Sequence, residues 1–556
     1  MSTALDIDVY TSKEERWSSG GIYISHFSLF VTSTSIYSSY LSHLQLQTSA
    51  LLERNVSLLD REWIQKILQY VPDTVPEGVT CNKVKRCDRK NVCAIVCERG
   101  SVQMKLWASR ALHIQRQASY ERDICTAQLP SSHNSAITLA DGYGIEDHIF
   151  EGYLRYISWI SSPLHIHTNN QHFSLTDQLQ LGVRFIELDV HWVDDDLRIA
   201  HCGGFRSKLI DEFVKILNDI AKHLGTEIEW DSETIGCKPS LSSIPAIEQR
   251  SVDKALEEIA IWLHANENEF LLVFFDDDDD LADWNKVKKL INYIKAHFPK
   301  EEIVAPSDIA NHHVWPTFRK LMVQGKRILF MSGANYSGKG DTYLFIKESI
   351  CNWTEPAMPL SLFPQCKFPK IVVGPTDTHD TIFRPETSEI QYAFLNANGH
   401  IGTNSFLLNE ASLPNAMRCG VNLPSPDNLT PTRLESMIWT MEPNVIWNGK
   451  DCLGIATYSS FWQIMECNDT KGIAAACQHR NNSRIWMITG LLTRITEAPD
   501  ACQKLSPEMI FSMPASGYEN NLLYEMLTSN HHQRVWLNTM RLKTTAIFIE
   551  LNASIV

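Results

Sequence analysis

The stretch Gly182-Val183-Arg184-Phe185-Ile186-Glu187-Leu188-Asp189 is a short apolar run that ends in two carboxylates. Other short apolar runs follow it, and amphipathic helical patterns separate them, which is typical of a parallel β/α architecture. Strands are predicted at 183–193, 198–202, 269–276, 327–332 and 370–375, and less clearly near 126–132, 399–406 and 420–426. Eight such strands predict a TIM-like (β/α)8 barrel, whose active site gathers at the C-terminal strand ends.

Two helical patterns between these strands have a single apolar face. One runs from Leu209 to Leu224, and the other comprises Val252, Ala255, Leu256, Ile259, Ala260 and Leu263. Such faces predict core packing and carry no chemistry. Residues 1–120 have no sustained period and are interpreted as an N-terminal extension, residues 121–435 as the barrel, and residues 436–556 as a small β-rich module.

The composition limits the classes of partner. The chain has 556 residues, with 50 basic and 65 acidic ones and a net charge of -15. It shows no basic run interleaved with aromatic residues, so nucleic acid is not an expected partner. The longest compact apolar run, Phe270 to Phe275, is far shorter than the ~18 residues of a membrane span. We therefore expect a soluble or peripherally membrane-associated protein.

Fourteen cysteines point to an oxidising compartment. Cys81, Cys87, Cys93 and Cys97 lie close together without a Cys-x-x-Cys pair, which favours disulfides over a zinc site. Asn-x-Ser/Thr sequons add support for a glycoprotein of the secretory pathway; they begin at Asn55, Asn335, Asn352, Asn428, Asn468, Asn481 and Asn552. The first residues lack the order of a secretory signal, so a cytoplasmic location stays open.

Glu187 and Asp189 are two positions apart, so on a strand their side chains leave the same face. Two carboxylates held together repel each other, and a bound cation relieves the repulsion. Ca²⁺ prefers carboxylate and amide oxygens, and Asn134 and Asp276 could supply more of them. The plain alternative is a solvated strand end.

His133 and His201 each lie near the end of a predicted strand. An imidazole has a pKa near neutrality, which suits both a general base and a general acid. A single histidine is more often structural, so the hypothesis depends on the combination with the acidic residues.

Three ordered motifs resemble the X-domain of phosphatidylinositol-specific phospholipase C: Leu129-Pro130-Ser131-Ser132-His133-Asn134-Ser135, Gly182 to Asp189, and Ile199-Ala200-His201-Cys202-Gly203. The resemblance implies a TIM-like barrel that cleaves an inositol lipid through a cyclic phosphate. It implies that His133 assists the attacking hydroxyl or steadies the transition state, and that His201 protonates the leaving oxygen. Asn134, Glu187, Asp189 and Asp276 match Ca²⁺ ligands of the eukaryotic branch, and Arg184 is expected to contact substrate.

Several residues depart from that family. The eukaryotic enzymes have Glu where Asp276 stands, and Met331 and Ser332 replace expected phosphate-binding lysines, which puts polyphosphorylated inositol in doubt. The bacterial metal-independent branch has an arginine at the position of Asp189, so Asp189 favours the metal-dependent version. Gly333 to Gly340 nearly spells a P-loop but lacks its Ser/Thr, and is interpreted as a barrel loop.

Two other places left alternatives open. Asp427 could contact substrate, orient a catalytic histidine from across the barrel or cap the following helix. In the C-terminal module, Glu442, Asn444, Trp462 and the nearby cysteines weakly resemble a C-type lectin segment, with possible Ca²⁺ and carbohydrate binding. A disulfide-stapled structural module is favoured there.

The sequence therefore predicts a Ca²⁺-dependent phosphoric diester hydrolase that acts on a membrane inositol lipid or another phosphodiester lipid. A glycerophosphodiesterase or sphingomyelinase-D-like barrel is the alternative enzyme, because it also places histidines and a Glu-x-Asp pair at strand ends. A carbohydrate- or lipid-binding protein without catalytic activity is the alternative from another class.

Overall fold

The computed structural model describes most of the chain from residue 69 to residue 539. The described ranges are 69–148, 168–193, 195–200, 244, 246–277, 280–309, 315–336, 343–356, 360–368, 371–372, 381–386, 407–447, 451–529 and 533–539. Several predicted features lie outside them: His201, the helical face from Leu209 to Leu224, the strand at 399–406, the sequons that begin at Asn55 and Asn552, and the second half of the stretch from Gly333 to Gly340.

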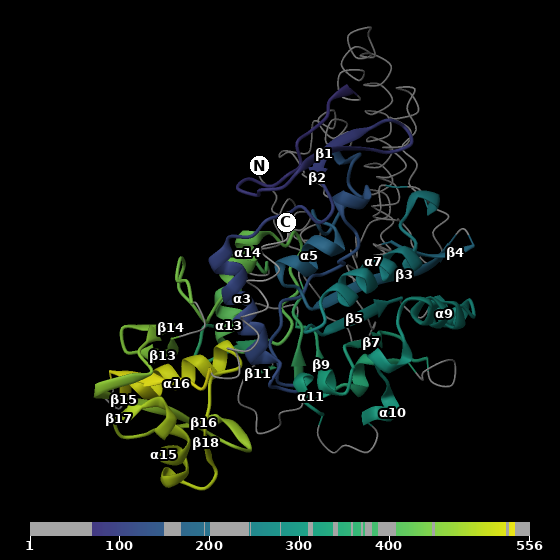
Figure 1. Cartoon of the computed structure of the whole chain (residues 1–556). Coiled ribbons are helices and arrows are strands. Elements are labelled where there is room, and N and C mark those ends of the chain that lie inside the picture. The colour runs from purple at the N-terminus through teal and green to yellow at the C-terminus, as the bar shows by residue number, and fades with distance from the viewer. Residues whose placement is uncertain are drawn as a thin grey trace, which may run out of the picture.

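Parallel strands form the centre of the fold (Figure 1). β3 (Phe185–Val193), β5 (Leu271–Asp276) and β7 (Ile328–Ser332) pair side by side, and β7 also pairs in parallel with β6 (Ile303–Val304) and β8 (Leu344–Ile346). The strands predicted at 183–193, 269–276 and 327–332 are thus confirmed. Their residues are almost all buried, as expected of parallel strands covered on both faces.

Two other strand predictions were wrong in their pairing. β4 (Asp196–Ile199) forms an antiparallel hairpin with β3 instead of a parallel strand, because the connection between them is too short for a crossover. β11 (Ile371–Val372) likewise pairs antiparallel with the neighbouring β10 (Lys367–Phe368) in a separate small sheet.

Further backbone contacts lead from β9 and β12 through the segments near Leu423 and Leu129 back to β3. β9 (Asn352–Thr354) pairs with β12 (Thr381–Phe383), and the Leu423 amide donates to the Phe383 carbonyl over 3.1 Å. The Leu129 amide donates to the Asn422 carbonyl over 2.8 Å, and Ser131 bridges to Phe185 of β3. Within the described ranges no ladder joins β8 to β9. The α/β class is confirmed, and the closed barrel stays a prediction.

The two faces of the sheet contact different apolar cores. Ile186 and Leu188 of β3, with Val273 of β5, pack on the face that also contacts the helices. The alternate residues pack into a second core, to which nearly every parallel segment contributes: Leu129, Phe185, Leu272, Phe274, Leu329, Met331, Phe345, Ile382 and Leu423. Because side chains alternate along a strand, Glu187, Asp189 and Asp276 share the face of this second core.

Helices cover the outer face of the sheet. The predicted stripe of α7 (Val252–Ala265) is fully buried, and the Ser251 side chain caps that helix by accepting from the Asp253 amide. The other α-helices described between residues 121 and 436 are α5 (Leu175–Leu181), α8 (Asp280–Asp283), α9 (Val287–His297), α10 (Pro306–Ile309), α11 (Phe318–Val323), α13 (Leu413–Arg418) and α14 (Pro431–Ser436). No helix among the described residues is both long and apolar enough to cross a bilayer.

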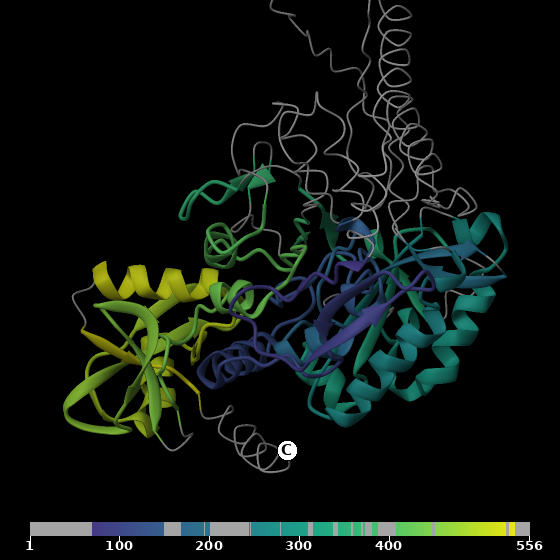
Figure 2. The same ribbon diagram turned by 90° about the horizontal axis from the view of Figure 1, so that it is seen from above.

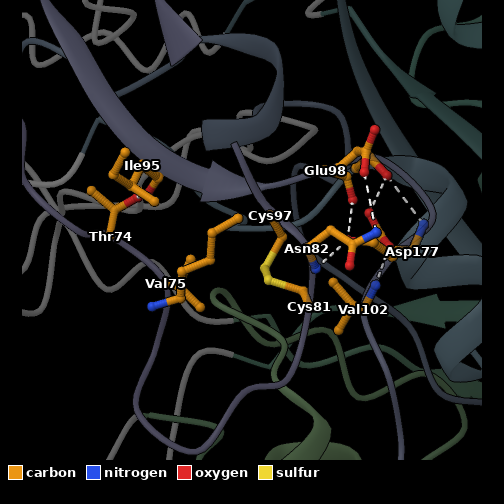
Figure 3. Close-up of a disulfide and its surroundings, with 12 residues drawn as sticks. Thr74, Val75, Cys81, Asn82, Ile95, Cys97, Glu98, Val102 and Asp177 are labelled. Atoms are coloured by element: carbon orange, nitrogen blue, oxygen red, sulfur yellow. Dashed lines mark hydrogen bonds between the residues drawn. A yellow bond between two sulfur atoms is a disulfide. The ribbon is translucent and has the colours of Figure 1, made fainter. Parts of the chain in front are cut away.

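The N-terminal segment is folded onto the α/β unit. β1 (Lys83–Cys87) and β2 (Cys93–Cys97) form a hairpin, which Cys81–Cys97 and Cys87–Cys93 crosslink. Figure 3 shows the first disulfide beside the Val102 amide, which donates to the Asp177 carboxylate of α5 over 3.0 Å. The predicted disulfides are confirmed. The helix α3 (Leu106–Ser119) that follows was not predicted from the sequence.

The C-terminal module contains mostly strands and lies to one side of the parallel sheet (Figure 2). Its sheet has the order β14-β13-β19-β15-β16, with β17 and β18 also paired to β15. Two disulfides, Cys452–Cys467 and Cys477–Cys502, staple it. Its elements are β13 (Cys452–Ala456), β14 (Ser459–Met465), β15 (Asn468–His479), β16 (Asn482–Ile488), β17 (Leu492–Arg494), β18 (Met509–Phe511), β19 (Arg534–Trp536), α15 (Ala498–Leu505) and α16 (Gly517–Ser529).

Candidate active site

Three carboxylates meet where the parallel pairing of β3 with β5 ends. Glu187 and Asp189 leave the same face of β3, and the register of the two strands sets Asp189 opposite Asp276. One oxygen from each of the three side chains lies within 4.8 Å of the others, and all three residues are buried. Like charges this close favour either protonation or a bound cation.

The two oxygens of Glu187 have different environments. Oε2 accepts from the Asn134 amide over 2.9 Å and from the Arg384 guanidinium over 2.5 Å. Oε1 is buried and accepts no hydrogen bond from the described part of the chain. A buried carboxylate oxygen without a donor is costly, so Oε1 with Asp189 and Asp276 fits a hard divalent cation such as Ca²⁺. Asn134 contacts Glu187 through its backbone, whereas the sequence pointed to its side-chain amide.

His133 is held by Asp427, which follows the predicted strand at 420–426. The His133 Nδ1–H donates to the Asp427 carboxylate over 2.7 Å, and the Asn170 amide donates to the same oxygen over 3.0 Å. Burial disfavours the charged imidazole, but the Asp427 carboxylate outweighs it and raises the pKa of His133 to about 10. Thr430, not Asp427, caps the following helix α14, so the geometry favours the orienting role over the capping role.

The segment leading to His201 starts beside the carboxylates. The Ala200 amide donates to the Asp189 carbonyl over 3.3 Å, at the end of the β3–β4 hairpin. His201 itself lies outside the described residues. Its placement relative to His133 therefore stays a prediction.

Arg184 is not brought together with the other candidates. It lies just before β3, at the start of the parallel pairing of β3 with β5, whereas Asp189 lies at the end of that pairing. Its Nε donates to Glu269 over 2.9 Å, and its Nη1 donates to the carbonyls of Leu179 and Val183. Arg116 and the Tyr120 hydroxyl bind the same Glu269 carboxylate over 2.7–2.9 Å. Arg184 thus belongs to a buried polar cluster that joins α3 to the sheet.

This cluster gives a stability prediction. Burial opposes ionisation of Glu269, but the charges of Arg116 and Arg184 outweigh it and hold its pKa well below the usual value. Glu269→Gln should lower the free energy of unfolding by about 3–5 kcal/mol, because two buried guanidinium groups lose their counter-charge. Denaturant unfolding followed by circular dichroism measures this. Glu257→Gln, which removes an exposed partner of Lys254, is the control and should leave the midpoint unchanged.

Sequence reasoning missed a buried arginine at the centre of the site. Arg384 follows β12 and has no exposed side-chain surface. It contacts Glu187, as well as Glu355 over 3.0 Å and Glu386 over 2.8 Å. Burial disfavours its charge, but these carboxylates more than compensate and raise its pKa. The sequence signal was present, because β12, Thr381-Ile382-Phe383, has two buried apolar residues and is followed directly by a charged one.

A lysine extends this charged group. Lys347 Nζ lies 3.1 Å from Glu355, and the Trp353 indole donates to Glu355 over 2.7 Å. Burial raises the pKa of Glu355, yet Lys347 and Arg384 together lower it to about 2. Glu355 is therefore ionised at neutral pH, and the carboxylates of the site outnumber its fixed cations.

Glu386 connects this charged group to His133, the candidate catalytic residue. Ligand atoms of His133, Glu187 and Glu386 lie within 4.8 Å of one another. Because Arg384 binds both Glu187 and Glu386, a protein cation already neutralises this side of Glu187. The side of Glu187 that fits a metal is the one toward Asp189 and Asp276.

The lectin-like residues of the C-terminal module have structural partners. Glu442 accepts from the Ser459 hydroxyl over 2.7 Å, and Asn444 lies in a turn with a left-handed backbone. Trp462 is fully buried, and its indole donates to Asn520 over 2.8 Å. Glu442 belongs to none of the groups of three His, Cys, Asp or Glu found among the described residues that could hold an ion.

The sequence of the chain is similar to that of a known protein over part of its length. A PI-PLC X domain-containing protein 1 from Arthroderma benhamiae is 25% identical over 213 residues, which make up 38% of this chain and 55% of that protein. This part of the chain is similar to the PI-PLC X-domain proteins. The match spans about half of that relative, and the name of the relative states no activity. No protein-family profile matches the chain.

Solved structures of PI-PLC enzymes align over a longer range but less closely. The enzyme from Listeria monocytogenes is 16% identical, covering 58% of this chain and 97% of its own, with a TM-score of 0.29. A Staphylococcus aureus enzyme is 11% identical, covering 59% of this chain and 98% of its own, with a TM-score of 0.31. TM-scores this low do not establish a shared fold, so the similarity to the X-domain proteins rests on the sequence match.

Proposed function

We propose that the chain is a phosphoric diester hydrolase that cleaves inositol lipids by histidine acid/base catalysis, assisted by Ca²⁺. The observation that carries the proposal is the buried His133–Asp427 pair beside the carboxylates of Glu187, Asp189 and Asp276. Its strands would close into the expected (β/α)8 barrel, with this group at the C-terminal mouth. The disulfides fit an oxidising compartment, and we propose a secreted protein that contacts membranes peripherally.

The residues would divide the reaction between two proton transfers. His133 would take the proton of the inositol hydroxyl next to the phosphate as that oxygen attacks phosphorus. His201 would give a proton to the diacylglycerol oxygen as its bond to phosphorus breaks, which leaves a cyclic inositol phosphate. Glu187, Asp189 and Asp276 would hold Ca²⁺, which supplies positive charge for the phosphate oxygens when bound.

The high pKa of His133 is compatible with this role. With a pKa of about 10, the imidazole is charged at neutral pH. A divalent cation beside Glu187 would disfavour the imidazolium and lower this pKa toward the range that a general base needs. Asp427 would keep the ring orientation fixed during the exchange of the proton.

The charges of the site support an inositol headgroup without further phosphates. Glu187, Glu355 and Glu386 already occupy the guanidinium of Arg384, and Glu355 also binds Lys347. Arg384 and Lys347 are thus both paired with carboxylates. Either of them could bind a phosphate only if one of these ion pairs broke. A headgroup with hydroxyls could instead donate hydrogen bonds to these carboxylates.

We expect phosphatidylinositol to be cleaved more than about tenfold faster than phosphatidylinositol 4,5-bisphosphate, because extra phosphates would meet a site whose carboxylates outnumber its fixed cations. The test measures water-soluble products from vesicles that contain one of these lipids or sphingomyelin, with Ca²⁺ present. Cyclic inositol phosphate from phosphatidylinositol supports the proposal. Free choline from sphingomyelin would favour the sphingomyelinase-D-like alternative, and equal rates on both inositol lipids would contradict the headgroup assignment.

A further inference from the structure

The C-terminal module presents two surface sequons whose surroundings fit covalent modification. Five of the seven Asn-x-Ser/Thr sequons start in the described part of the chain, at Asn335, Asn352, Asn428, Asn468 and Asn481. The structure separates them by exposure, because Asn428 is buried and the other four are exposed. A glycan needs an acceptor at the surface of the folded protein.

Structural roles explain the sequon at Asn428. This asparagine is 8% exposed, has a left-handed backbone, and its amide donates to the Asn170 carbonyl over 2.7 Å. The hydroxyl of its sequon partner Thr430 accepts from the Arg433 amide and so caps α14. A glycan would not fit beside Asp427 without disrupting its contact with His133.

The sequons at Asn335 and Asn352 lie partly in the protein interior. Tyr336, the middle residue of the first, is 1% exposed, and its hydroxyl donates to Asp277. Trp353, the middle residue of the second, packs near the rings of Phe185 and Phe274. In both, the backbone near the acceptor is fixed by a side chain that points inward.

The sequons at Asn468 and Asn481 lie at the surface over all three residues. Asn468 begins β15, and both it and Thr470 are exposed. Asn481 is exposed in the tight turn between β15 and β16, and Asn482 and Ser483 are half-buried. The Cys452–Cys467 disulfide ends one residue before Asn468. The disulfide indicates that the module folds in an oxidising compartment. In eukaryotes, N-linked glycans are added in the same compartment.

We propose that Asn468 and Asn481 carry N-linked glycans and that Asn428 does not. In the transfer, the Asn side-chain nitrogen forms a bond to the first sugar carbon of a lipid-linked oligosaccharide pyrophosphate. The sugar–phosphate bond breaks, the lipid pyrophosphate leaves, and the amide loses one proton. Both acceptors lie on the module, to one side of β3 and β5 (Figure 2), so the glycans would leave the candidate active site accessible. This proposal does not depend on the phosphodiesterase activity.

The test maps occupied sites on the full-length protein purified from its native cells. Peptide N-glycosidase in ¹⁸O-labelled water converts each glycosylated Asn into labelled Asp, which peptide mass spectrometry locates. We expect the label at Asn468 and at Asn481 and none at Asn428. A missing label at Asn468 or Asn481 overturns the assignment of that site, and a label at Asn428 contradicts the exposure argument.

Variants distinguish glycan loss from a change in folding. Thr470→Ala and Ser483→Ala keep the acceptor asparagines but remove the sequon hydroxyls. Each variant should therefore lack one glycan and migrate faster than the wild type on a denaturing gel, by the shift that one glycan causes. Asn482→Gln is the matched control, because it changes the same turn as Asn481 and keeps that sequon. Its glycan number should equal that of the wild type. Loss of a glycan from Asn482→Gln would show that the structure of the turn, and not the sequon hydroxyl, determines whether Asn481 is glycosylated.

Discussion

Replacing His133 with alanine should lower kcat on phosphatidylinositol vesicles by about 10²–10⁴-fold, the usual contribution of a positioned acid/base group. Asp427→Asn should give a loss of similar order, because an amide cannot stabilise the imidazolium that forms when His133 takes a proton. Both residues are buried and contact each other over 2.7 Å. Initial rates of product release, measured with saturating lipid and Ca²⁺, give these values.

The interpretation requires that the variants stay folded and that the two losses are not independent. His264→Ala removes a surface histidine, which pairs with Glu302 over 3.1 Å, and should leave kcat unchanged. The double variant His133→Ala/Asp427→Asn should be no worse than His133→Ala alone, since Asp427 acts through the ring. Wild-type rates in a folded His133→Ala protein would refute its catalytic role.

Replacing Asp189 with alanine should weaken Ca²⁺ binding by more than about 100-fold, beyond the usual effect of residues that only support metal ligands. The reason is that Glu187, Asp189 and Asp276 form one buried group, and two remaining carboxylates make a poor Ca²⁺ site. Isothermal titration with Ca²⁺ measures the affinity. Lipid cleavage should fall in parallel, both in this variant and after chelation of the wild type.

A matched acidic variant separates a specific site from general negative charge. Asp283→Ala removes an exposed carboxylate in α8, outside the group of three. It should bind Ca²⁺ as the wild type does. If chelator and Asp189→Ala both leave cleavage unchanged, the metal assignment is wrong, and Arg384 and Lys347 would then be the remaining candidates for the cation of the site.

Local patterns predicted the parts of the site that one strand or one strand end determines. Alternation along β3 is enough to place Glu187 and Asp189 on one face, and the ends of neighbouring parallel strands meet at one edge, which brings in Asp276. Strand polarity also predicts where Arg184 lies. Because it precedes β3, it lies at the opposite end of the parallel β3–β5 pairing from Asp189.

Contacts between distant segments could not be predicted in the same way. The His133–Asp427 pair joins residues 294 positions apart, and the Arg384–Glu187 pair joins residues 197 positions apart. No spacing rule links such positions, so the sequence left the role of Asp427 open and did not indicate which carboxylates Arg384 binds. The β3–β4 hairpin was missed because an apolar run alone does not distinguish a parallel strand from an antiparallel one.

The central claim is that two imidazoles and a divalent cation act on a single phosphorus. A crystal structure of the protein with Ca²⁺ and a bound inositol phosphate tests it most directly. We expect Ca²⁺ on Glu187, Asp189 and Asp276, with the rings of His133 and His201 both within hydrogen-bonding distance of the same phosphate. A phosphate bound away from His133, or a His201 ring directed into another region, would contradict the account.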